Sequence, residues 1–439
     1  MVIPIKTDTE AAGMFSQKLT FFDFFFVFVL IIYSGRANVY VTTDSFTENP
    51  IGMLIPVLLG GILALRWNVK LDGRFFLLIF GFAVYFIAIS IKYTDIQPTF
   101  FIKYLFIFFI VYTAVKSLKT DLFKIYELVV FYLAIIALIF WGIQTGLGGD
   151  TLYYIFRSIP DIDIYSYVSG DGLNAFLYSV QPTYTSIRYG FLPRNSGYTW
   201  EPGAFAVYLC LALFINLFFT TSDKNHKIRF WVLLIALIST QSTTGYLIFM
   251  VITVFYYFNK RLNIVLLVFP LVIIGLIYLS TLPFMSQKVI ELVEETKGIE
   301  LLVERTIGRE EEMTPQRFTS FIITFTDFRD NPLLGLGNHV EDSWTYKIGA
   351  NVSSISGIGD LLAQFGLVGF LFFFILTYKT SSFFARHFDY NGAPLLFIII
   401  LFISVSYSIL FLPLVMCFWM YYLFKPIEKT VELKDIQEA

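Results

Sequence analysis

The sequence predicts an all-α fold, a bundle of about twelve transmembrane helices with two large external loops. Three observations carry this prediction. Hydrophobic residues make up 57% of the 439 positions and charged residues only 15%, where a soluble domain carries about 25%. The apolar residues form runs of about 20, the length a helix needs to cross a bilayer. Nor do the runs show the short alternating pattern of an outer-membrane barrel.

The clearest apolar runs are 75–91, 128–145, 204–219, 262–280 and 357–378. Helices are expected in all of them because every backbone polar group must be satisfied inside the lipid. The last apolar block, 393–423, is predicted to be two short helices that turn near Leu412-Pro413. Residues 1–18 show no cleavable signal.

Short loops rich in Lys and Arg predict the cytoplasmic side of the membrane. They lie at 66–74, 116–124, 224–229, 260–261 and 379–386. The resulting order is transmembrane helices in 1–145, an external loop in 146–200, helices in 201–281, a second external loop in 282–356, helices in 357–424 and a tail in 425–439. Both termini are then predicted to be cytoplasmic, in a multi-pass membrane protein.

The second external loop is predicted to contain two amphipathic helices that lie on the bilayer surface. The first covers 287–307. The second begins at Thr314-Pro315, an N-cap followed by proline, and ends before Asn331-Pro332. The two cysteines, Cys210 and Cys417, lie in predicted spans and are expected to be free packing residues.

Charged residues beside a span are costly and therefore indicate function. In the segment 194–203, Arg194 and Glu201 stand at the start of the apolar run that follows Pro202. Glutamate before proline suits the first turn of a helix. Tyr198 and Trp200 have a second interpretation, since aromatic residues also anchor helices at the membrane interface.

This patch resembles the Wzy-type polymerases of O-antigen and capsule and the related WaaL-type O-antigen ligases. Three later segments extend the resemblance. They are the polar break 239–245, Arg317 with the Pro-x-x-Gly-x-Gly segment 331–337, and the small-polar segment 353–369 with its Phe-Gly-x-x-Gly sequence. The resemblance covers about two-fifths of the chain and implies a GT-C-like bundle in a bacterial inner membrane.

The resemblance also implies a donor glycan joined through a diphosphate to undecaprenol. An acceptor hydroxyl displaces the diphosphate with inversion, and cations stabilise the leaving group. Arginine suits this task because it grips phosphate oxygens bidentately. Arg194 and Arg317 are therefore predicted to be catalytic, while Arg188, Arg305, Tyr198 and Asn338 are predicted to bind the diphosphate or the glycan.

Two residues are candidates for the base, Glu201 and His339. Glu201 has the alternative role of holding an arginine by a salt bridge. A histidine with this function is implied by the ligase branch, and His226 and His387 fall in cytoplasmic loops. Asp161-Ile162-Asp163 has the spacing of a divalent-metal site, but the resemblance implies catalysis without a metal. No other cofactor is predicted, and no glycine loop for a nucleotide is present.

Polymerisation of lipid-linked repeat units is the preferred function, with ligation of finished glycan to lipid A-core as the alternative. A flippase or transporter is the alternative from another class, but the predicted spans are nearly uncharged in their middles. The resemblance implies a chain-length regulator as partner. The net charge of −2 and the lack of a basic stripe predict no nucleic-acid partner.

Overall fold

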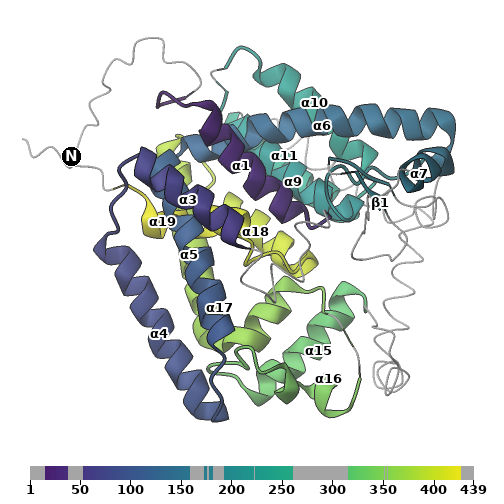
Figure 1. Cartoon of the computed structure of the whole chain (residues 1–439). Coiled ribbons are helices and arrows are strands. Elements are labelled where there is room, and N and C mark those ends of the chain that lie inside the picture. The colour runs from purple at the N-terminus through teal and green to yellow at the C-terminus, as the bar shows by residue number, and fades with distance from the viewer. Residues whose placement is uncertain are drawn as a thin grey trace, which may run out of the picture.

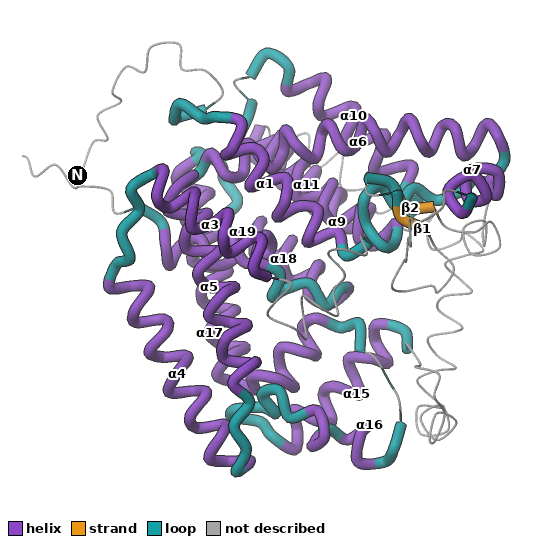
Figure 2. Tube along the Cα trace, viewed as in Figure 1, coloured by secondary structure: helices purple, strands orange, loops and turns teal. Residues whose placement is uncertain are grey.

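The structure is a computed structural model that describes residues 15–37, 53–158, 173–175, 177–180, 192–221, 223–260, 315–350, 352 and 354–426. Helices dominate these residues (Figures 1 and 2). A short antiparallel pair, β1 Leu173–Asn174 and β2 Ser179–Val180, places Leu173 opposite Val180. The helices are α1 Phe21–Gly35, α3 Leu54–Arg66, α4 Gly73–Tyr93, α5 Pro98–Leu118, α6 Asp121–Leu147, α7 Gly149–Arg157, α9 Pro202–Phe218, α10 His226–Ser239, α11 Thr243–Lys260, α15 Arg317–Asp330, the 3-10 turn η3 Val340–Asp342, α16 Trp344–Lys347, α17 Gly357–His387, α18 Leu395–Ser406 and α19 Pro413–Phe424.

Among the described residues, four helices are long and apolar enough to cross a membrane. They are α4, α5, α6 and α17, and three of them contain the predicted runs 75–91, 128–145 and 357–378. The run 204–219 forms the shorter helix α9. The predicted runs 262–280 and 287–307 lie outside the described residues. The structure thus agrees with a multi-pass membrane protein, while the count of about twelve spans stays a prediction.

Helix α9 is the centre of the bundle. Every residue from 202 to 218 except Leu217 is buried, because α6, α10 and α11 pack around it. Small residues allow the closest approach: a Cβ on Gly245 of α11 would overlap Ala206 of α9. Cys210 and Cys417 are free and buried, as predicted.

Helix α17 is kinked at Gly366, whose φ of 61° is accessible to glycine. The kink frees backbone groups on both sides of it, and the loop 332–337 pairs with them. Leu336 and Gly337 donate to the carbonyls of Ala363 and Gln364, each at 2.8 Å, while Leu367 donates to the carbonyl of Pro332 at 2.8 Å. The glycines of the Pro-x-x-Gly-x-Gly segment and of the Phe-Gly segment therefore form one joint.

Helices α18 and α19 form a hairpin, as the sequence indicated. Thr380 of α17 donates to the carbonyl of Trp419 at 3.0 Å, and Ser381 donates to that of Ala393. The start of α18 and the end of α19 therefore lie together beside the second half of α17. Each helix has 12 residues, about 18 Å long, which is shorter than the hydrocarbon layer. The turn between them consequently lies within the bundle.

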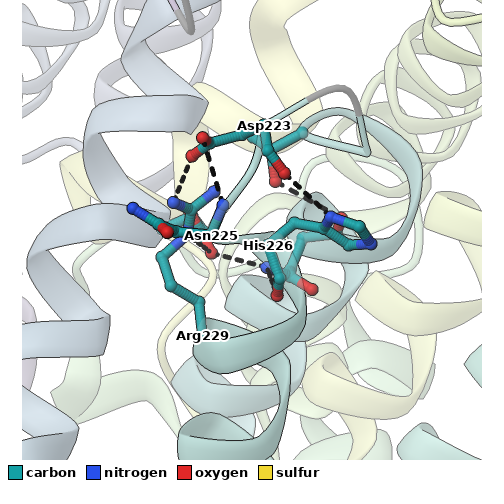
Figure 3. Close-up of polar contacts among 7 residues, drawn as sticks. Asp223, Asn225, His226 and Arg229 are labelled. Carbon is teal, nitrogen blue, oxygen red and sulfur yellow. Dashed lines mark hydrogen bonds and ion pairs between the residues drawn. The ribbon is translucent and has the colours of Figure 1, made fainter.

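An ion-pair region joins the start of α6 to the loop before α10. Arg229 is nearly buried and contacts two carboxylates, Glu127 of α6 at 2.8 Å and Asp223. In Figure 3 Asp223 lies against the Arg229 guanidinium, and the carbonyl of Asp223 accepts a hydrogen bond from His226 Nδ1 at 2.9 Å. Nearby, Lys124 pairs with Asp121 at 3.3 Å. Arg229 and Lys124 thus each have at least one carboxylate partner.

Candidate functional site

The loop that carries Arg194 is fixed by the polar break between α10 and α11. Asn195 binds Ser239 twice, through its backbone N–H at 3.0 Å and its side-chain amide at 2.9 Å. Arg194 Nε donates to the carbonyl of Thr240 at 3.1 Å. The carbonyls that the break leaves unpaired in the helix are thus satisfied by this loop. The segment 194–203 and the polar break 239–245, which are far apart in the sequence, therefore contact each other.

Glu201 and Arg317 come together at the start of α9. Glu201 is the N-cap of that helix and Arg317 is the first residue of α15, with Arg317 Nη2 lying 3.7 Å from Glu201 Oε1. The turn of the C-terminal hairpin supplies the other contacts of Arg317. Its Nε donates to the carbonyl of Ser406 at 2.8 Å, and its Nη2 donates to the Tyr407 hydroxyl at 2.7 Å. We call Arg194, Glu201, Arg317 and Tyr407 the arginine cluster.

Gly203 allows this cluster to form. The Tyr407 hydroxyl, which also interacts with Glu201, lies so close to Gly203 that a Cβ at that position would overlap it. The Arg317 guanidinium stands over the Tyr407 ring, 4.7 Å from its centroid. Position 203 of Glu201-Pro202-Gly203 therefore needs a residue without a side chain, because Tyr407 packs against it.

The cluster has two cations and one carboxylate. Burial lowers the pKa of Arg194, and Glu201 opposes that effect. Burial also acts to lower the pKa of Arg317, but Tyr407 and Glu201 outweigh it and the pKa is raised. Arginine stays charged in proteins, so both guanidinium groups are cations. The Arg317 side chain is 34% exposed and that of Glu201 29%, which leaves the cluster accessible to an anion.

Beside the cluster lies a polar cavity of about 380 Å³ between α5, α15 and α17. Ser320 and Thr324 of α15 line it, and Arg317 precedes Ser320 by one helical turn on the same face. Lys103 of α5 and Asp360 of α17 line it as well. The Asp360 carboxylate accepts a hydrogen bond from Ser408, which follows Tyr407 in the hairpin turn. None of the four cluster residues lines the cavity, but Arg317 lies one turn from Ser320 and Tyr407 is next to Ser408, so the arginine cluster lies beside it.

His339 lies at the same cavity, in the loop that follows the Gly-x-Gly segment. His339 is 7% exposed, and its ring stacks on the ring of Tyr93, with the two centroids 4.5 Å apart. Nδ1 lies 3.2 Å from Gln97 Nε2 and 3.5 Å from Asp95 Oδ2. Asn338 instead donates to Gln97 Oε1 at 2.9 Å from an exposed position. The His339 ring thus contacts the end of α4 and the loop that joins α4 to α5.

The other predicted site residues have different positions. Tyr198 is 2% exposed and packs on Phe205 and Tyr208, and Trp200 is 6% exposed beside Tyr407. These two aromatic side chains belong to the protein core, because packing against α1 and α9 removes them from both lipid and solvent. Tyr198 therefore has the position of a packing residue. Arg188 and Arg305 lie outside the described residues.

Sequence reasoning missed Tyr407, Lys103 and Asp360 as parts of the site. For Tyr407 a signal was present, because Ser406-Tyr407-Ser408 is a polar interruption of a strongly apolar block. Lys103 also gave a signal as a charge inside an otherwise apolar helix. Within the described ranges, no group of three or more His, Cys, Asp or Glu side chains is placed to hold a metal ion. Asp161 and Asp163 lie outside those ranges.

Fold and site together define a class of protein, a multi-pass helical membrane protein with a cationic site beside a polar cavity. Residues 228–374, a third of the chain, match the family model described as O-antigen ligase. This match supports placing the chain in the superfamily of O-antigen ligases and polymerases, whose members are glycosyltransferase-like enzymes. It covers Arg317, His339 and Asp360 but not Arg194 and Glu201. No curated protein matches the chain.

Proposed function

We propose that this protein polymerises glycan repeat units linked to undecaprenyl diphosphate, transferring the growing chain to a hydroxyl of the next unit. The observation that carries the proposal is the arginine cluster. Arg194 and Arg317 are more than a hundred positions apart in the sequence, yet both lie near the one carboxylate of Glu201. An excess of positive charge at a partly open site fits a polyanionic ligand.

The cluster suits a diphosphate leaving group. Negative charge grows on the diphosphate as the bond to the anomeric carbon breaks, so nearby guanidinium groups stabilise the transition state more than the ground state. Glu201 and Tyr407 keep the Arg317 guanidinium in one orientation. A preoriented cation requires little rearrangement during the reaction. We accordingly assign Glu201 the role of positioning Arg317.

His339 is then the proposed base. It lines the polar cavity, and the Asp95 carboxylate lies 3.5 Å from its Nδ1. A carboxylate beside Nδ1 favours the proton on that nitrogen, so that the other nitrogen can accept a proton. The acceptor hydroxyl would occupy the cavity between His339 and the arginine cluster. Arg188, Arg305 and Asn338 stay proposed ligands of the diphosphate or glycan, and the chemistry is proposed to need no metal.

The proposed orientation follows the charge rule. The ion-pair region and the basic ends of α3, α5 and α17 lie on the cytoplasmic side, together with both termini. The arginine cluster and the polar cavity then face the periplasm, where flipped lipid-linked glycans are found. A chain-length regulator is the proposed protein partner.

Ligation of finished glycan to lipid A-core is the second candidate, favoured by the description of the matching family model. The donor chemistry is the same for both reactions. Polymerase is preferred because Glu201-Pro202-Gly203 and the long segment before it resemble that branch more closely. A flippase stays the alternative from another class.

The test is deletion of the gene in its native host, followed by mass spectrometry of the lipid-linked glycans and of the surface polymer. Complementation uses the wild type, Arg194→Ala and Arg317→Ala, with Arg329→Ala as matched control, since Arg329 of α15 is 73% exposed. We expect single repeat units to accumulate in the deletion and in both site variants, while Arg329→Ala restores polymer. Long lipid-linked chains would instead identify a ligase, and units trapped in the cytoplasm a flippase.

A further inference from the structure

An apolar groove lies between α4 and the bundle, next to the polar cavity. It has a volume of about 340 Å³ and is lined by Leu77 and Phe82 of α4, Phe372 and Phe373 of α17, and Trp419 of α19. In Figure 1, α4 lies at the flank of the molecule. Only 17% of the apolar stretch of α4 is buried, against 56% of that of α5. The groove therefore exists because α4 stands apart from α17 and α19.

The groove opens to the surrounding hydrocarbon. Leu77 is 70% exposed, Val368 47% and Phe372 38%, and all three line it. A surface of this kind is stable in a lipid environment and takes an apolar chain as its ligand. Along α4 the lining runs from Arg74 to Tyr85, about 17 Å at the rise of a helix.

The end of the groove near Tyr85 meets the polar cavity. Tyr104 and Phe411 line both spaces, so one layer of aromatic side chains separates them. Lys103, the neighbour of Tyr104, lines the polar side. The Tyr104 hydroxyl donates to Gln364 Oε1 at 3.0 Å, which fixes the ring in this wall. An amphiphile with one apolar chain and an anionic head matches the two spaces in sequence.

We propose that the apolar groove binds the isoprenoid chain of the lipid-linked substrate, at the part of the chain next to the diphosphate. The diphosphate then lies where the groove and the polar cavity adjoin, at Tyr104, Phe411 and the neighbouring Lys103. This inference rests on the proposed function for the identity of the head group. It adds a binding site for the lipid, on α4, α17 and α19, to the site for the anion.

Gly81 offers a variant that fills the groove without disturbing the fold. It lines the groove, and a Cβ at this position meets no atom within 4 Å. Gly142 of α6 is the matched control, because its Cβ position is equally open and the residue is exposed on another helix. Gly81→Phe and Gly142→Phe thus carry the same substitution at two unobstructed helical positions.

The experiment is photocrosslinking of the purified full chain in nanodiscs of phosphatidylethanolamine and phosphatidylglycerol. The probe is undecaprenyl diphosphate with a diazirine in the isoprene units next to the diphosphate, and crosslinked peptides are identified by mass spectrometry. We expect labels on α4, α17 and α19 that unlabelled undecaprenyl diphosphate competes away. Gly81→Phe should reduce this labelling about tenfold, while Gly142→Phe should leave it unchanged.

Labelling confined to other helices would overturn the proposal, and so would equal competition by added phosphatidylglycerol, which would mean a groove for bulk lipid. Equal loss of labelling in both glycine variants would overturn it too. Labelling needs no turnover, so its result is independent of the polymerase test. Groove labelling in a protein whose deletion leaves surface polymer unchanged would retain the lipid site and reject the function.

Discussion

Arg229 and Arg317 each lie close to a glutamate, but their surroundings differ. Arg229 is 3% exposed and contacts two carboxylates, Glu127 and Asp223. Arg317 is 34% exposed along its side chain, and it shares the single carboxylate of Glu201, 3.7 Å away, with Arg194. The first arginine is compensated within the protein (Figure 3), whereas the arginine cluster, counted over the described part of the chain, keeps an excess of positive charge.

This difference separates structural charges from functional ones. A buried arginine that contacts two carboxylates has its charge compensated within the fold, so its removal should affect folding first. An accessible pair of arginines with one carboxylate still attracts an anion, so removal of one should affect ligand and reaction first. Variants at Arg229 and in the arginine cluster should therefore lose different properties, stability in the first case and turnover in the second.

The largest effect is expected for Arg229→Met, which leaves Glu127 buried without its cation. Breaking a buried ion pair in this way costs about 3–5 kcal/mol of stability. The double variant Glu127→Gln/Arg229→Met removes both charges and should recover much of the loss. Thermal unfolding in detergent measures both changes, and the folded fraction of Arg229→Met should keep its activity per molecule. A folded but inactive Arg229→Met protein would show that Arg229 also serves function, and the distinction between structural and functional charges would then not hold.

Arg317→Met should have the opposite result, a loss of turnover of about 10²–10³-fold with little change in unfolding temperature. Arg317→Lys keeps the charge but loses the planar fork, so its turnover should lie between that of Arg317→Met and the wild type. Turnover of a purified lipid-linked donor, measured beside unfolding, tests this. Unfolding of Arg317→Met would show that the arginine cluster is structural.

Gly203→Ala probes the same cluster indirectly. The new Cβ would overlap the Tyr407 hydroxyl and displace the ring that contacts Arg317. We expect turnover to fall about tenfold, with loss of part of the alignment that electrostatic stabilisation requires. Tyr407→Phe in the same chain removes the overlapping oxygen, so the double variant should regain the stability lost by Gly203→Ala. Wild-type turnover in Gly203→Ala would contradict the positioning role of Tyr407.

The sequence predicted the parts of this molecule that depend on local pattern. The apolar runs gave α4, α6 and α17. Charge beside a span indicated Arg194 and Glu201, and the resemblance indicated Arg317; the catalytic roles of these three residues stay predictions. The helix predicted to start at Thr314-Pro315 begins at Arg317 instead, with Gln316 as its N-cap. Helix ends shift in this way because several neighbouring residues can serve as caps.

The contacts between distant segments could not be predicted. The proximity of Tyr407 to Gly203 depends on how the C-terminal hairpin packs against α9, and no periodicity records that distance. In the same way, the charges of Lys103 and Asp360 do not by themselves indicate that α5 and α17 lie around one cavity. A single sequence gives the residue types of a site, whereas their convergence follows from tertiary packing.

The smallest effect is expected at Asp72, where a second compensated pair allows a test by pH. Burial acts to raise the pKa of Asp72, but hydrogen bonds from Lys116 and the backbone of Phe75 lower it overall. A carboxyl whose pKa is depressed by folding stabilises the protein above its unfolded pKa of about 3.9, and that contribution is lost as pH falls through the lower folded value.

Asp72 is the N-cap of α4, and asparagine caps a helix equally well. Asp72→Asn should therefore cost only about 0.2–1 kcal/mol at neutral pH and lose less stability than the wild type between pH 5 and pH 3. Parallel acid-induced losses of stability in the two proteins would show that the Lys116 pair contributes nothing, and compensation in pairs would then be restricted to the buried Arg229.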